Sequence, residues 1–139
     1  MFIQAISSNK FQVMAEVTAE KNEKIAQMNF GSIYPHYLNR IEKHGRTKEE
    51  LDQVILWLTG YDQNKLESFI GGSGTFGDFF EGAKIHENAH LIKGVVCGYR
   101  IEEIPEEFSL YRDCRRMEKL IDELAKGRKL EKILREEKK

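Results

Sequence analysis

The chain has 139 residues, of which 40% are hydrophobic and 32% are charged, which is typical of one water-soluble globular domain. Its 22 basic and 23 acidic residues give a formal net charge of -1, so we expect no overall attraction to nucleic acid or to an anionic membrane. The sequence has no apolar run that approaches the length of about 20 residues that a membrane-spanning helix needs. Its N-terminus does not resemble a secretion signal. The two cysteines, Cys97 and Cys114, make a poor disulfide framework, so we expect both thiols to be reduced and buried and the protein to be cytoplasmic.

The N-terminal residues show no clear hydrophobic period and include several polar side chains. We therefore predict a flexible extension over residues 1–24 and a single helical domain over residues 25–139. The sequence leaves open whether Met14 is the natural start, in which case residues 1–13 would not belong to the natural protein.

The first strong helix is predicted after Ser32, a good N-cap residue, with Pro35 tolerated in its first turn. One side of this helix carries the apolar residues Ile33, Tyr34, Tyr37, Leu38 and Ile41. Gly45 ends it, and a second helix follows almost at once, so the two should form a helical hairpin.

Residues 47–59 carry the most complete helix signal in the chain. Thr47 with Glu50 three residues later matches a capping box, and Gly60 supplies a residue that ends a helix. The stripe that faces the core consists of Leu51, Val54, Ile55 and Leu58. Trp57 lies at the edge of this stripe, so we expect the rest of the fold to gather against it.

Two shorter helices should follow. Asp62 can cap a helix that ends at the glycines from Gly71, and Thr75 can cap another. The second of these carries three apolar aromatic residues at helical spacing, Phe76, Phe79 and Phe80. These phenylalanines are predicted to be a main part of the core.

The segment 88–104 has two interpretations. Leu91, Val95 and their apolar neighbours form a helical stripe, which favours a helix, although Gly94 and Gly98 weaken it. The alternative is a strand over residues 95–101, which are rich in strand-forming types. We favour the helix because the stripe continues for more than two turns.

Pro105 and Ser109 open the last long helix. Its narrow apolar seam consists of Leu110, Cys114, Met117, Ile121 and Leu124. This seam, over residues 110–124, suits either the core of the same chain or a homodimer. Together the elements predict an all-α, single compact domain of five or six short helices.

Several motifs occur in the order in which a known bacterial family has them. They are Gly31–Tyr37, Gly45–Glu50, Trp57–Tyr61, Phe79–Phe80, Gly94–Ile104, Asp122–Gly127 and Glu131–Arg135. Over residues 24–135 the chain resembles domain-of-unknown-function family 2200. The resemblance implies a compact, mainly helical bacterial cytosolic protein, and it implies no established activity, cofactor or catalytic residue. The chain departs from the family pattern at His86–Ala89, where the family has an Asn-Pro-Asn-Arg-like turn, and over Phe108–Met117.

A candidate binding pocket follows from the polar and aromatic residues inside these motifs. They are Tyr34, His36, Arg46, Trp57, Cys97, Arg100 and Glu102. If they converge, they would supply a cationic wall and an aromatic floor for a small anion or a planar ligand. The alternative is that Tyr34 and Trp57 fill the core while Arg46, Arg100 and Glu102 make surface ion pairs.

The run from His86 to His90 is a literal H-E-x-x-H, which on a helix would bind zinc through His86 and His90, with Glu87 as general base. The corresponding turn of the family has neither histidine, and Asn88 is better placed to cap a helix that begins near Ala89. We therefore predict no metal site here and no cofactor elsewhere.

Two further functional interpretations concern Cys97 and the basic C-terminal residues. Cys97 near Arg100 could be a nucleophile, but the apolar run Val95–Cys97 favours inert packing. A basic tail over residues 126–139 and the helical hairpin could bind nucleic acid, but acidic residues interrupt both. The sequence thus predicts a non-enzymatic domain that binds a ligand or partner, with a small zinc hydrolase and a weak nucleic-acid binder as alternatives.

Overall fold

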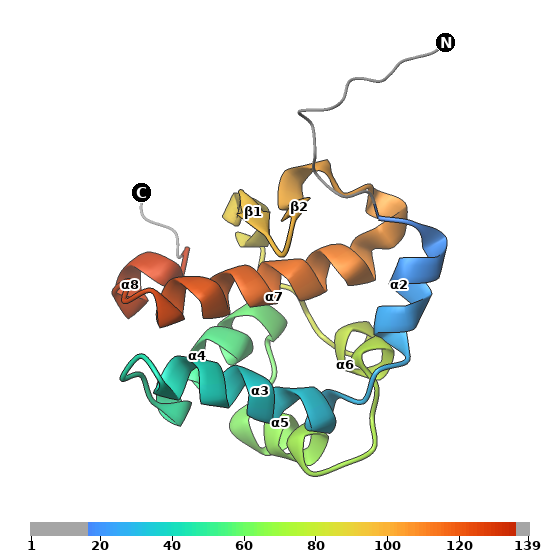
Figure 1. Ribbon diagram of the computed structural model, residues 1–139. Coiled ribbons are helices and arrows are strands. Elements are labelled where there is room, and N and C mark those ends of the chain that lie inside the picture. Colours follow the sequence, from blue (N-terminus) through green and yellow to red (C-terminus); the bar gives the residue numbers. More distant parts are fainter. Residues whose placement is uncertain (1–16, 136–139) are drawn as a thin grey trace.

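The computed structural model describes residues 17–135, and their fold is all-α, as predicted (Figure 1). Its α-helices are α2 (Ala19–Ala26), α3 (Phe30–Glu42), α4 (Lys48–Thr59), α5 (Gln63–Ile70), α6 (Phe76–Glu81), α7 (Ser109–Ala125) and α8 (Leu130–Ile133). Between α6 and α7 lie the single-turn 3-10 helices η2 (Ala89–Leu91), η3 (Ile101–Glu103) and η4 (Glu106–Phe108), and the strands β1 (Val95–Val96) and β2 (Tyr99–Arg100). None of the helices in this part of the chain has the length and apolar character to cross a membrane.

The central helix α4 has the ends that its sequence predicts. Thr47 and Glu50 form the capping box, and Gly60 ends the helix with a left-handed φ of 76°. The four apolar side chains of its predicted stripe are all fully buried. A Cβ at residue 60 would also make a tight contact, 3.0 Å from the Lys84 carbonyl oxygen.

Helix α3 begins earlier than predicted, because its N-cap is Asn29 and not Ser32. The Asn29 Oδ1 atom accepts the Ser32 backbone N–H at 2.7 Å. The Asn29 amide also donates to the Gly74 carbonyl at 3.2 Å, and Asn29 forms an isolated β-bridge with Thr75. This helix start therefore combines a local cap with a contact to a segment 45 residues away in the sequence.

The aromatic core forms where α3, α5 and α6 meet. Phe79 stacks on Phe30 at a centroid distance of 4.2 Å and meets Phe69 edge-on at 5.1 Å. The predicted phenylalanine cluster of α6 is buried, which confirms its place in the core. Thr75 caps α6 as predicted, and Asp78 completes a second capping box.

Helix α7 lies across the other helices and packs against α2, α3, α4, α6 and α8 (Figure 1). The seam residues Cys114, Met117, Ile121 and Leu124 are buried in the main core cluster. The chain itself therefore covers most of the apolar surface that was considered for a homodimer.

The helix favoured for residues 88–104 is wrong. Strands β1 and β2 form an antiparallel hairpin in which Val96 pairs with Tyr99, so the alternative of a single continuous strand is also wrong. The two turn residues, Cys97 and Gly98, have φ angles of 54° and 84°, the positive values that a type I′ turn requires. Gly94 and Gly98, the two residues that weaken the predicted helix, both have positive φ angles. A helix cannot continue through residues in this conformation.

The predicted boundary at residue 24 falls inside α2, which packs against α6 and α7. Asn22 of this helix accepts the Tyr111 backbone N–H at 3.1 Å. The rest of the predicted extension, residues 1–16, lies outside the described residues. Met14, the alternative start, is one of residues 1–16. The division of the chain at residue 24 stays a prediction.

Candidate functional site

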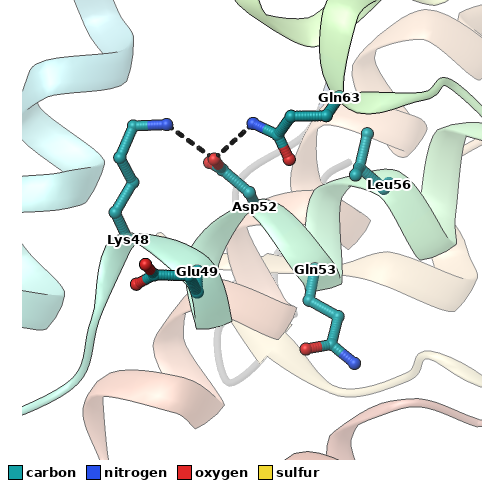
Figure 2. A pocket seen from close by; sticks show the side chains of 6 residues that line it. All are labelled: Lys48, Glu49, Asp52, Gln53, Leu56 and Gln63. Atoms are coloured by element: carbon teal, nitrogen blue, oxygen red, sulfur yellow. Dashed lines mark hydrogen bonds and ion pairs between the residues drawn. The ribbon is translucent and has the colours of Figure 1, made fainter.

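A surface pocket of about 420 Å³ lies beside α4 where α5 begins (Figure 2). Its lining residues are Lys48, Glu49, Asp52, Gln53, Leu56 and Gln63. Five of these come from α4 and the sixth is the first residue of α5. Gly60 ends α4, and the short connection after it places the start of α5 beside α4 as the second wall of the pocket.

Asp52 is the buried polar centre of this pocket, with a residue exposure of 4%. Its Oδ2 atom accepts from Lys48 Nζ at 2.7 Å and from Gln63 Nε2 at 2.8 Å, as Figure 2 shows. Its Oδ1 atom accepts from the Tyr34 hydroxyl of α3. A buried carboxylate is stable only when hydrogen bonds replace its lost hydration, and these three donors do so.

Glu67 extends the same network along α5. Its Oε2 atom accepts from Lys48 Nζ at 2.8 Å and from Gln63 Nε2 at 2.9 Å. Although desolvation acts against the charged ammonium, its hydrogen bonds to Asp52 and Glu67 raise the pKa of Lys48. Burial and the bond to Asp52 raise the pKa of Tyr34, so its hydroxyl remains a donor at neutral pH.

The charge of the pocket favours cations over anions. One ammonium and two carboxylates line it, so the lining carries one net negative charge. The exposed side chains of Glu49 and Gln53 add acceptor oxygens at the surface. The pocket can therefore accept hydrogen bonds from a neutral or positively charged polar group.

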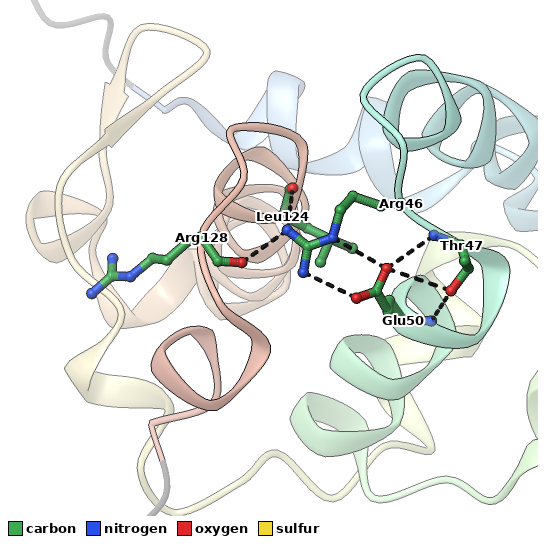
Figure 3. A network of polar contacts seen from close by, with 5 residues as sticks. All are labelled: Arg46, Thr47, Glu50, Leu124 and Arg128. Carbon is green, nitrogen blue, oxygen red and sulfur yellow. Dashed lines mark hydrogen bonds and ion pairs between the residues drawn. The ribbon is translucent and has the colours of Figure 1, made fainter.

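Arg46, from the predicted pocket, joins two helix ends instead (Figure 3). Its guanidinium forms two hydrogen bonds of 3.1 Å with the Glu50 carboxylate at the start of α4. It also donates to the carbonyl oxygen of Leu124 in the last turn of α7 at 3.0 Å and to that of Arg128, between α7 and α8, at 2.9 Å. Arg46 therefore joins the start of α4 to the last turn of α7 and to the segment that follows it.

The structure places the other predicted pocket residues on separate elements. Arg100 and Glu102 are brought together, with 3.9 Å between guanidinium nitrogen and carboxylate oxygen. His36 is exposed on α3. Cys97 is exposed in the hairpin turn, so the prediction that it is buried as inert packing is wrong. Tyr34 is the member of the predicted set that bonds to a residue of the α4–α5 pocket, through Asp52. Ligand binding by the complete set stays a prediction.

The H-E-x-x-H segment does not form the helix that zinc binding requires. The His86 ring stacks on Trp57 at a centroid distance of 4.1 Å, and its Nδ1 atom accepts the Asn88 backbone N–H at 2.9 Å. The His90 ring turns back to the Glu87 carbonyl oxygen at 3.0 Å. Within residues 17–135, no three His, Cys, Asp or Glu side chains are grouped so that they could hold a metal ion.

Sequence reasoning missed the residues that line the α4–α5 pocket. The available signal was Lys48 and Asp52, an opposite-charge pair one turn apart on α4, with Asp52 directly after the buried Leu51. Such pairs are common on exposed helix faces, so the pattern does not show that one member is buried. The burial of Asp52 becomes visible only in the structure, where Tyr34 and Gln63 approach it from other helices.

The family model described as "Uncharacterized protein conserved in bacteria (DUF2200)" matches residues 24–135. The chain belongs to this family. This confirms the resemblance seen in the sequence, and the family description assigns DUF2200 proteins to bacteria without an activity. A crystal structure titled as that of uncharacterized protein SP1917 is 33% identical, with a TM-score of 0.76, over 84% of this chain and 97% of that chain. A search of curated proteins found no match.

Proposed function

We propose that this DUF2200 protein is a binding domain whose α4–α5 pocket takes an amine, guanidinium or amide group. The observation that carries the proposal is the buried Asp52 carboxylate, held by three donors behind a pocket with a net negative lining. Buried polar networks at the base of a pocket fix the orientation of the groups around them. Glu49 and Gln53, which are exposed, would meet the ligand first.

The same contacts favour binding without catalysis. A general base needs an acceptor site free for the substrate proton, whereas Asp52 already accepts from Tyr34, Lys48 and Gln63. The acidic lining disfavours a phosphate group and therefore nucleic acid at this surface. The two free cysteines suit a reducing compartment, so we place this binding function in the cytoplasm.

The experiment is a titration of the isotope-labelled protein followed by two-dimensional NMR. The probes are methylguanidinium and butylamine, with acetate and methyl phosphate as anionic controls of similar size. We expect the two cations to shift backbone signals of residues 48–53 and 63 and the anions to leave them in place. Shifts from the anions alone, or cation shifts confined to other regions, would contradict the proposal.

A pair of matched variants tests the site. Glu49→Gln removes one pocket charge at an exposed position and should weaken cation binding by about two- to fivefold, the range of an exposed ion pair. Glu81→Gln makes the same change on α6, outside the pocket lining, and should leave binding unchanged.

The amine, guanidinium or amide group that the pocket takes belongs either to a free small molecule or to a side chain of a partner protein. Short peptides that contain one arginine or lysine distinguish these sources. Tighter binding of a peptide than of the isolated cation points to a protein partner, and equal binding points to a small molecule.

A further inference from the structure

The two cysteines contact the same carboxylate from different elements. Cys97 Sγ lies 3.6 Å from Glu118 Oε1, and Cys114 Sγ lies 3.8 Å from Glu118 Oε2. Cys114 and Glu118 are one turn apart on α7, and Cys97 comes from the β1–β2 turn, where β1 packs against α7. The contacts with Glu118 therefore place two thiols that are 17 positions apart in the sequence close together.

The two thiols differ in access to solvent. Cys97 is exposed, whereas Cys114 is buried, with an exposure of 1%. An oxidant in solution therefore reaches Cys97 first. Cys97 also has a left-handed backbone, a conformation that favours glycine or asparagine, and this turn carries its thiol at the surface of α7.

Glu118 is itself held in place. Its carboxylate accepts from the Tyr37 hydroxyl at 3.1 Å and from the Arg115 guanidinium. A fixed carboxylate next to both thiols can accept a proton when either sulfur reacts. Desolvation and the Glu118 carboxylate raise the pKa of Cys97, and the cations Arg115 and Arg40 oppose this only in part, so the placement of the two thiols and not their acidity carries the argument.

We propose that Cys97 and Cys114 are a redox pair that a small-molecule disulfide converts to an intramolecular disulfide between the hairpin and α7. The Cys97 thiolate attacks one sulfur of the small disulfide, forms a mixed disulfide and releases one small thiolate. The Cys114 thiolate, whose proton passes to Glu118, then attacks the Cys97 sulfur and releases the second. Two protein thiols are oxidised, one small disulfide is reduced, and the two protons end on the two small thiols.

The hairpin allows the movement that this bond requires. A disulfide needs Cα atoms about 4.4–6.8 Å apart and direct contact between the two sulfurs, so the Cys97 thiol must move past the Glu118 carboxylate toward Cys114. The hairpin has two residue pairs, Val95 with Arg100 and Val96 with Tyr99. A hairpin this small shifts with little loss of backbone hydrogen bonds. This inference is independent of the α4–α5 pocket.

The test treats the folded full-length protein with oxidised glutathione and measures its intact mass and free thiols. We expect the mass to fall by two hydrogen atoms and the free thiols to fall from two to none. Proteolysis without a reductant should then give one peptide pair joined through Cys97 and Cys114. A persistent glutathione adduct, a disulfide-linked dimer or no reaction would each overturn the proposal.

Two single variants separate the steps. Cys114→Ser should stop at a glutathione adduct on Cys97, because the second thiol is missing. Cys97→Ser should leave the buried Cys114 unmodified while the protein is folded. Rapid modification of Cys114 in that variant would show that Cys97 is not the point of entry and would contradict the proposed order.

Discussion

Asp52 shows how a single buried charge organises this protein at the scale of the residue. Its carboxylate joins three helices, because Tyr34 comes from α3, Lys48 from α4 and Gln63 from α5. Each donor compensates part of the cost of burying the charge. Removing the charge should therefore weaken the fold as well as the pocket.

We expect Asp52→Asn to lower the free energy of unfolding by about 1–3 kcal/mol, because the buried amide cannot accept all three donors. Urea denaturation followed by circular dichroism measures the change. Glu49→Gln, an exposed change three positions earlier, is the control and should stay within about 0.5 kcal/mol of the parent protein. Equal stability of the two variants would show that the Asp52 network does not contribute.

A second effect at the scale of the residue is the raised pKa of the Cys97 thiol. Desolvation of its sulfur beside α7 and the nearby Glu118 carboxylate raise the pKa of Cys97, and the cations Arg115 and Arg40 oppose this only in part. The reactive thiolate is therefore scarce at neutral pH and increases as the pH rises.

Alkylation of Cys97 by iodoacetamide should accordingly accelerate through the alkaline range, above the pH at which a free cysteine peptide does so. Mass spectrometry at a series of pH values gives both rates. Glu118→Gln removes the repelling charge and should move the profile of the protein toward lower pH. A profile that matches the peptide would contradict the raised pKa.

At the scale of the element, one side chain, Glu50, accepts two kinds of hydrogen bond at the start of α4. Glu50 accepts from the Thr47 backbone N–H within the capping box, and its carboxylate also binds the Arg46 guanidinium. The bond to Arg46 and then the bond to Thr47 lower the pKa of Glu50. A pKa lowered in the folded state stabilises the fold above the unfolded-state pKa, and this contribution is lost as the pH falls through the folded-state pKa.

The stability of Glu50→Gln should therefore depend less on pH in the acidic range than that of the parent protein, and the two should differ most at neutral pH. Urea midpoints at several pH values between neutral and acidic conditions test this. Glu131→Gln, at an exposed position in α8, is the control and should keep the parent slope. A Glu50 variant with the parent slope would exclude the proposed linkage.

At the scale of the whole molecule, the fold depends on the contact of α6 with α3 and α5. Phe79 is fully buried and lies against Phe30, Phe69 and Phe80. Its loss would leave a cavity that three helices cannot close without moving.

Phe79→Ala should lower the free energy of unfolding by about 3–5 kcal/mol. Phe108→Ala, which truncates a half-buried ring in η4, should cost clearly less. Thermal unfolding followed by circular dichroism compares the two variants with the parent. Similar losses in both would show that the α6 cluster is not the centre of the core.

The elements that the sequence predicts well are those whose signals are local. The capping box at Thr47, the caps at Asp62 and Thr75, and the stripes of α4 and α7 depend on residues within one or two turns. The family resemblance was equally visible, because its motifs keep their order along the chain. The sequence by itself therefore determined the fold class and most of the helices.

Tertiary contacts decided the rest. The Asn29 cap of α3 also bonds to Gly74, and the hairpin at Cys97 packs against α7, and neither of these distant contacts can be read from a local pattern. The α4–α5 pocket exists because Tyr34 and Gln63 approach Asp52 from other helices. The physical reason is the same in each case: a buried polar group or a left-handed turn is stable only with its distant partners in place, and a linear pattern does not contain them.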